Sequence, residues 1–198
     1  MNPNELRGHL IAKRALEIAA VGNHSVLLVG IHGAGKATIA SAFPHLNIKT
    51  ADSCPCGHYQ SVSRECTCPP RLIYGWLRRL DRNAGDFDLL VEVPPLTVRE
   101  KQIPPDLSFA QSMDARIAAA REFGTTHTST AFDPIAERVF EMATRRLTFT
   151  TGRTIQMVRV ARSIANLAQS DILKGCHVAE AAQYGHIYWF DPARLAAA

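Results

Sequence analysis

The feature that most constrains this chain is a short glycine-rich segment that follows an apolar run. Residues 30–36 read GIHGAGK and satisfy the pattern G-x-x-x-x-G-K. Residues 25–29, SVLLV, precede this segment and are bounded by polar and glycine residues, which is typical of a buried strand in a parallel sheet. Residues 37–43 can form a helix behind it. A strand, a glycine loop and a helix in this order predict a phosphate-binding loop.

The residues of this loop have distinct expected roles. Glycines let the backbone turn tightly, so that N–H groups and the N-terminus of the next helix face phosphate oxygens. Lys36 is expected at the β- and γ-phosphates of a nucleotide. Ala37 stands where a Ser or Thr hydroxyl would bind Mg²⁺, and the side chain of Thr38 points about 100° away on a helix. We therefore expect phosphate binding with weakened Mg²⁺ coordination. The expected nucleotide contacts in the loop are Gly30, Ile31, His32, Gly33, Ala34, Gly35, Lys36, Ala37 and Thr38. The alternative is a glycine turn with a solvated lysine.

The rest of the chain divides into an α/β part and a helical part. Residues 46–50 and 89–93 predict two further strands, the first of them weak. Helices are expected near residues 9–20, 72–80, 109–120, 134–146, 154–169 and 175–184. The expected organisation is a reduced α/β region at 1–95 with a Cys-rich loop at 52–71, a linker at 96–105, a helical lid domain at 106–185 and a tail at 186–198.

Four of the five cysteines lie close together in the sequence. Cys54, Cys56, Cys66 and Cys68 form two C-x-C pairs that can supply four thiolates to Zn²⁺. In a reducing cytosol such a cluster favours a metal over disulfides. C-x-C is less usual in zinc sites than C-x-x-C, so a loop with reduced, unbound thiols is the alternative. Cys176 is expected to lie on a helix with its side chain buried.

Composition excludes few classes of protein. A chain of 198 residues can bury one substantial core, and a net charge of +4 permits contact with nucleic acid without arguing for it. Arg78, Arg79 and Arg82 either contact DNA phosphates or form a solvated helix face. No apolar run is long enough to cross a membrane, and the N-terminus has no signal-peptide stretch, so a cytoplasmic location is expected.

Several sequence blocks, together with the phosphate loop, resemble one family. They are AKRALEIAA (12–20), CPCG (54–57), ECTC (65–68), LLVEVPP (89–95), RVARSIANLA (159–168) and HVAEAAQY (177–184). In this order they resemble the magnesium-chelatase-like AAA+ ATPases of the YifB/ComM type. The resemblance implies a P-loop AAA+ core with a helical lid, hydrolysis of Mg-ATP, ring-shaped homo-oligomers and motor action on DNA. It also implies a nucleotide contact for Arg153, which lies near the sensor-2 arginine of the family.

The chain departs from the family pattern where the family carries out catalysis. Only 17 residues separate Lys36 from Cys54, so the segment with the acidic Walker B strand is missing. Asp52 replaces an asparagine that senses the γ-phosphate, and should repel that phosphate. Asp86 replaces the arginine finger, a group that contributes about 10³–10⁵-fold to phosphoryl transfer. With the strand order that the resemblance implies, an internal deletion of this kind leaves a small, incomplete parallel sheet in which LNIKT, SVLLV and LLVEV lie side by side in that order.

The sequence thus favours an α/β P-loop protein that binds ATP but hydrolyses it weakly or not at all. Whether it is an enzyme is left open by these residues. The alternatives are an active ATPase motor subunit acting on DNA in a ring, a zinc-stabilised interaction module with a relic loop, and a decaying gene product.

Overall fold

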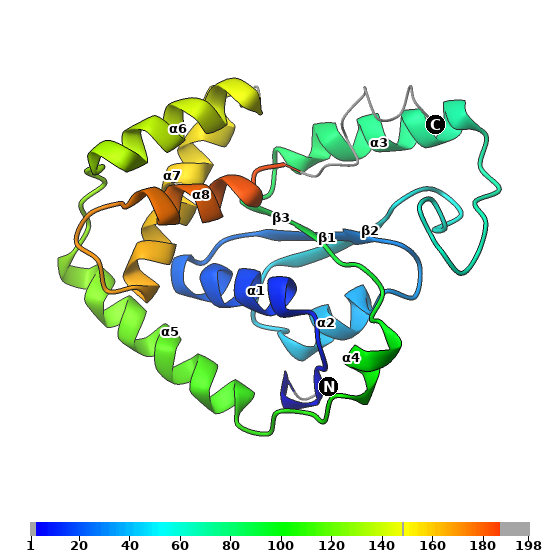
Figure 1. Cartoon of the computed structure of the whole chain (residues 1–198), viewed down its shortest axis with the longest axis horizontal. Coiled ribbons are helices and arrows are strands. Elements are labelled where there is room, and N and C mark those ends of the chain that lie inside the picture. The colour runs from blue at the N-terminus through cyan, green and yellow to red at the C-terminus, as the bar shows by residue number, and fades with distance from the viewer. Residues whose placement is uncertain (1–2, 148, 187–198) are drawn as a thin grey trace.

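The computed structural model describes residues 3–147 and 149–186, and the expected tail lies outside these residues except for His186. Its centre is a parallel sheet of three strands, β1 (Val26–Gly30), β2 (Ile48–Asp52) and β3 (Leu89–Glu92), in the order β2-β1-β3. The predicted α/β class and the predicted order of the three strands are both confirmed (Figure 1).

The positions of the strands in the sheet explain their sequences. All five residues of β1 are buried, because β1 has a neighbour on each side, and this accounts for its unbroken apolar run. β2 and β3 each pair only with β1, but β3 is buried where α1 packs on it, whereas β2 is partly exposed, which accounts for the weak apolar pattern of β2. Val26 is level with both Ile48 and Leu89, so the three strands start together.

Helices surround the sheet and fill the C-terminal part of the chain. The helices are α1 (Leu10–Gly22), α2 (Lys36–Ala42), α3 (Pro70–Ala84), α4 (Val98–Gln102), α5 (Phe109–Thr126), α6 (Pro134–Arg146), α7 (Thr151–Leu167) and α8 (Gly175–Gln183), with a short 3-10 turn η1 at Pro3–Glu5. Every expected helix is present. Among the described residues, no helix combines the length and apolar character needed to span a membrane.

One helix was not expected. Residues 96–105 were predicted to be a linker, but α4 lies within them. Thr97 starts this helix with a capping box: Thr97 Oγ1 accepts a hydrogen bond from the Glu100 N–H, and Glu100 Oε2 accepts one from the Thr97 N–H at 2.8 Å. The spacing T-x-x-E at residues 97–100 is present in the sequence and indicates the start of a helix rather than a linker.

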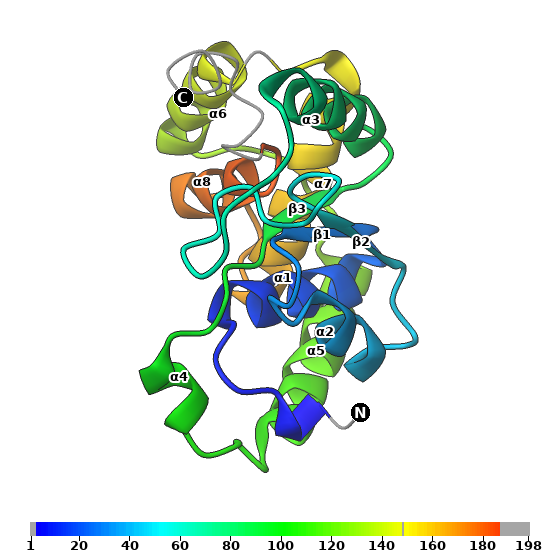
Figure 2. The same ribbon diagram turned by 90° about the vertical axis from the view of Figure 1, so that its right-hand side faces the viewer.

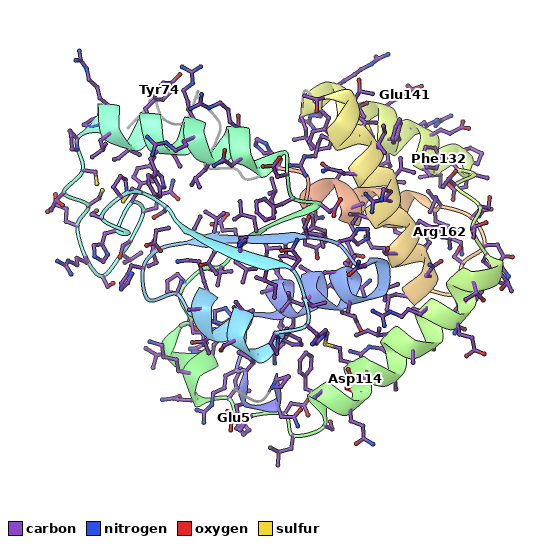
Figure 3. All side chains as sticks on the ribbon, turned by 180° about the vertical axis from the view of Figure 1, so that it is seen from behind. Glu5, Tyr74, Asp114, Phe132, Glu141 and Arg162 are labelled. Carbon is purple, nitrogen blue, oxygen red and sulfur yellow. The ribbon has the colours of Figure 1, made fainter. Side chains whose placement is uncertain are left out.

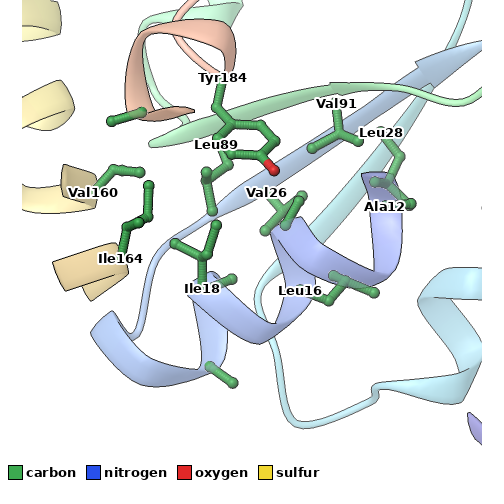
Figure 4. Packing of buried hydrophobic residues seen from close by; sticks show 14 of the residues in the cluster. Ala12, Leu16, Ile18, Val26, Leu28, Leu89, Val91, Val160, Ile164 and Tyr184 are labelled. Carbon is green, nitrogen blue, oxygen red and sulfur yellow. The ribbon is translucent and has the colours of Figure 1, made fainter. Parts of the chain in front are cut away.

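The two faces of the sheet carry separate hydrophobic clusters. Alternate residues of β1 point to opposite faces. Leu27 and Val29 pack with Ile73 and Leu77 of α3. Residues on the other face pack against α1, and Figure 4 shows Leu16, Ile18, Val26, Leu28, Leu89 and Val91 in this arrangement. The sheet is therefore a middle layer between α3 on one side and α1 with α2 on the other (Figure 1).

The larger cluster extends from the α/β part into the helical part. It includes buried Val160 and Ile164 of α7, which face Ile18 of α1 (Figure 4). α5 also packs beside α1 (Figure 2). A buried hydrogen bond of 2.8 Å joins His24 Nε2 to Ser163 Oγ. The expected boundary at 96–105 separates the two parts in sequence, whereas in space they share one core.

Candidate functional site

The predicted phosphate loop connects the carboxyl end of β1 to the start of α2. Gly30 ends the strand so close to β3 that a Cβ there would lie 2.3 Å from the Val93 carbonyl oxygen. Gly35 has φ +91°, a left-handed value that residues with side chains rarely adopt, and directly precedes α2. Glycine at these two positions thus allows the sharp reversal that brings Lys36 back over the loop.

The side chain of Lys36 is held inside the loop. Its ammonium donates hydrogen bonds to the Gly30 carbonyl oxygen at 2.9 Å and to that of Ile31 at 2.7 Å. A third contact, at 2.9 Å, joins it to Asp52 Oδ1. The side chain is only 7% exposed. Since an ammonium has three N–H donors, these partners saturate it, and an incoming phosphate has to replace one of them.

Asp52 is the replaceable partner. It ends β2, directly beside Gly30 in the strand pairing, and its side chain is 38% exposed. His32 Nδ1 lies 3.9 Å from its other oxygen, Oδ2. The sequence predicted that Asp52 would repel a γ-phosphate. The structure adds that this carboxylate neutralises Lys36, which depends on strand register and was not readable from the sequence.

The other predicted nucleotide contacts divide into three groups. The side chains of Ile31 and Ala34 are buried in the hydrophobic core. His32, Gly33, Ala37 and Thr38 lie exposed around the loop, and Ala37 has no hydroxyl to offer a metal ion. Arg153 is not near them. Its guanidinium donates to the carbonyl oxygens of Phe87, at 2.7 Å, and Ala84, just before β3 begins.

The distance between Arg153 and the loop follows from the sheet. Leu89, at the start of β3, is level with Val26, whereas the loop leaves β1 at Gly30. Four residues of strand span about 13 Å. Arg153 therefore lies towards the opposite end of the strands, and its position gives no support to the predicted nucleotide contact.

The four clustered cysteines come together as predicted. Their Sγ atoms all lie within 4.8 Å of one another. Cys54 and Cys56 are 3.3 Å apart, and their distances to Cys66 are 3.7 and 3.6 Å. A tetrahedral zinc ion with bonds of about 2.3 Å places its sulfur ligands about 3.8 Å apart. The donor set fits Zn²⁺, and the three sulfur–sulfur distances lie within about 0.5 Å of this value.

Electrostatics also favour a cation among these sulfurs. The backbone N–H of His58 lowers the pKa of the Cys56 thiol to about 5, and burial raises the pKa of the Cys66 thiol to about 12. The Tyr59 N–H points at Cys54 Sγ from 3.2 Å. Donors aimed at the sulfurs stabilise thiolates, but four thiolates this close repel one another unless a positive ion lies between them.

The fifth cysteine does not follow the prediction. Cys176 is exposed on α8, while its neighbours Gly175, His177 and Val178 are buried. Free cysteines on helices are usually buried, which was the basis of the prediction, but α8 turns this position outwards.

Two surface features remain separate from the loop. A cavity of about 400 Å³ is lined by residues of α1, α4 and α5 and contains none of the loop residues. Arg78, Arg79 and Arg82 are exposed on α3, where Arg78 lies over the ring of Tyr74, which points away from the sheet (Figure 3).

Comparisons with known proteins agree with this architecture. The family model described as magnesium chelatase, subunit ChlI, matches residues 3–47, and the model of the ChlI C-terminal region matches residues 110–185. The chain is also 31% identical over 147 residues to a protein named Uncharacterized protein YifB from Escherichia coli (strain K12). That alignment covers 66% of this chain and 28% of the other protein, so the chain spans just over a quarter of that relative. The segment with β2, the cysteines and β3 lies between the two family-model matches.

Proposed function

Because this chain belongs to the magnesium-chelatase-like AAA+ family of the YifB type, we propose that it binds ATP through the Gly30–Lys36 loop and hydrolyses it weakly or not at all. The observation that carries the proposal is the position of Lys36. Its ammonium is already held over the loop by the Gly30 and Ile31 carbonyl oxygens, which leaves only the contact with Asp52 to exchange for a phosphate.

Three features support weak hydrolysis. Ala37 supplies no Mg²⁺ ligand, and Asp52 places a negative charge where the γ-phosphate would approach. Arg153 is engaged by carbonyl oxygens at the other end of the strands. Phosphoryl transfer depends on metal ions and cationic groups around the γ-phosphate, so loss of several such groups reduces the rate by orders of magnitude.

Zn²⁺ is the second proposed ligand, held by Cys54, Cys56, Cys66 and Cys68. The sulfur–sulfur distances and the N–H groups aimed at the sulfurs support a closed structural site. Bound zinc would supply a tetrahedral crosslink between the two ends of the loop that carries the cysteines. Treating the purified chain with a chelator and measuring released zinc tests this assignment.

Self-association is supported by the edge of the sheet. Among the described strands, β2 has no partner on its outer side, and an unpaired edge favours pairing with another chain. Lys49 is exposed on this strand and opposes such pairing. Light scattering over a range of protein concentrations, with and without ATP, measures the outcome. Contact of α3 with DNA remains a prediction.

A binding titration tests the main proposal. A fluorescent ATP analogue is titrated into the folded chain with and without Mg²⁺, beside Lys36→Ala and Lys49→Ala. Lys49→Ala removes the same charge from the exposed face of β2 and serves as the matched control. Binding that Lys36→Ala abolishes, that Lys49→Ala preserves and that changes little with Mg²⁺ supports the proposal. Absence of binding to the folded wild-type chain refutes it, and rapid phosphate release refutes the loss of hydrolysis.

A further inference from the structure

We propose that the metal ion bound by the four cysteines holds the phosphate loop in its binding conformation, so that metal and nucleotide bind cooperatively. This inference rests on the proposed function, because it requires the loop to bind a nucleotide. The metal is a divalent ion that prefers thiolate ligands, such as Zn²⁺. Its binding changes the affinity of the Gly30–Lys36 loop for nucleoside triphosphate.

A direct backbone hydrogen bond joins the two sites. The N–H of His32, inside the phosphate loop, donates to the carbonyl oxygen of Gly57 at 2.7 Å. Gly57 has φ +80°, and a Cβ there would lie 2.6 Å from the Cβ of His32. The two segments are therefore in contact at a position where only glycine fits.

The metal ligands determine the conformation at Gly57. Cys56 immediately precedes Gly57, and the N–H of Gly57 donates to the Cys54 carbonyl oxygen at 2.9 Å. The Tyr59 N–H, two residues further on, donates to Cys54 Sγ. The chain thus turns around the sulfur of Cys54, with Gly57 at the turn. A metal ion bonded to Cys54 and Cys56 fixes this turn, and without the ion the turn depends on a few hydrogen bonds such as those to the carbonyl oxygen and the sulfur of Cys54.

The same turn also positions the partner of Lys36. Ser53 lies between Asp52 and Cys54; its N–H donates to the Gly30 carbonyl oxygen at 3.1 Å, and its hydroxyl donates to the Tyr59 carbonyl oxygen at 2.9 Å. The Gly30 carbonyl oxygen is in turn one of the acceptors that hold Lys36. A change in the cysteine turn therefore reaches the loop at two points, His32 and Gly30.

Thermodynamic linkage sets the expected result. If the ordered turn favours the binding conformation of the loop, metal raises nucleotide affinity, and nucleotide raises metal affinity by the same factor. Coupling between sites is typically 5- to 150-fold, and we expect about tenfold here.

The experiment measures both affinities in the full chain. The affinity for a fluorescent ATP analogue is measured after zinc loading and after removal of zinc by a chelator, with folding verified by circular dichroism. The affinity for zinc is measured in competition with a chromophoric chelator, with and without ATP. We expect zinc to strengthen nucleotide binding about tenfold and ATP to strengthen zinc binding by the same factor.

Gly57→Ala separates coupling from metal binding, because it keeps all four sulfurs while its Cβ pushes the turn away from His32. Gly75→Ala is the matched control, since an added Cβ there meets no atom within 4 Å. We expect zinc-loaded Gly57→Ala to bind nucleotide about tenfold more weakly than the wild-type chain, with an affinity that no longer responds to zinc, and Gly75→Ala to behave as wild type.

The outcomes distinguish this inference from the proposed function. Equal nucleotide affinity of the folded wild-type chain with and without zinc, or wild-type affinity in Gly57→Ala, overturns the coupling and leaves nucleotide binding intact. Failure of the zinc-loaded wild-type chain to bind nucleotide overturns the proposed function. If removal of zinc unfolds the chain, the zinc-loaded Gly57→Ala measurement alone decides.

Discussion

Replacing Asp52 with asparagine should strengthen nucleotide binding in the absence of Mg²⁺. In the free protein the Asp52 carboxylate contacts Lys36 at 2.9 Å, so a phosphate has to displace it. After displacement the carboxylate stays beside the loop, because β2 pairs with β1 up to Gly30. Asparagine keeps the shape of the side chain and removes both the competition for Lys36 and the repulsion of the phosphate.

The size of the effect follows from the charges. Two unit charges about 5 Å apart interact with about 3 kcal/mol at an effective dielectric constant of 20. Asp52 is 38% exposed, and water and salt screen an exposed charge, which reduces the expected gain to about 1–2 kcal/mol. This gain corresponds to roughly 5- to 30-fold tighter binding. The loss of a partly exposed ion pair should lower the free energy of unfolding by at most about 1 kcal/mol.

Titration of the fluorescent ATP analogue in EDTA measures this change. Asp86→Asn is the matched control, because it makes the same replacement at an exposed site outside the loop. Unchanged or weaker binding of Asp52→Asn in EDTA would refute the reasoning. Repeating the titration with Mg²⁺ tests the opposite role: if Asp52 holds the metal ion, the variant loses affinity only when Mg²⁺ is present.

Three further predictions concern stability. Burial, partly offset by Asp88, lowers the pKa of His24 to about 4, so between pH 7 and pH 5 the unfolded chain binds a proton on His24 that the folded chain does not bind. The free energy of unfolding should therefore fall by about 2 kcal/mol between pH 7 and pH 5, and urea titrations of His24→Gln should lose this pH dependence. Ile164→Ala should cost about 3 kcal/mol, and calorimetry should still show a single transition because α7 shares its core with the α/β part; two separate transitions would contradict a common core. Arg153→Ala should lower the melting temperature while leaving nucleotide affinity unchanged, whereas a selective loss of affinity would restore the predicted contact.

Local sequence patterns were sufficient for most elements of the fold. The apolar run before Gly30 and the glycine loop after it predicted β1 and the start of α2, because a strand buried on both faces and a tight turn each impose their own composition. The weak strand at residues 46–50 is displaced by two residues in the structure, to Ile48–Asp52, as expected for a strand with a mixed pattern. The missed helix α4 had a readable capping box.

Only part of the candidate nucleotide and metal sites could be predicted from the sequence. The sequence by itself determined that a phosphate loop with Lys36 follows a buried strand and that four cysteines lie within metal-binding reach, because both depend on residues close together in the chain. The tertiary structure alone decided that Asp52 neutralises Lys36, that Arg153 lies at the other end of the strands, and that Gly57 contacts His32. These three contacts depend on strand register and on the packing of segments up to 69 residues apart, which no local pattern of side chains encodes.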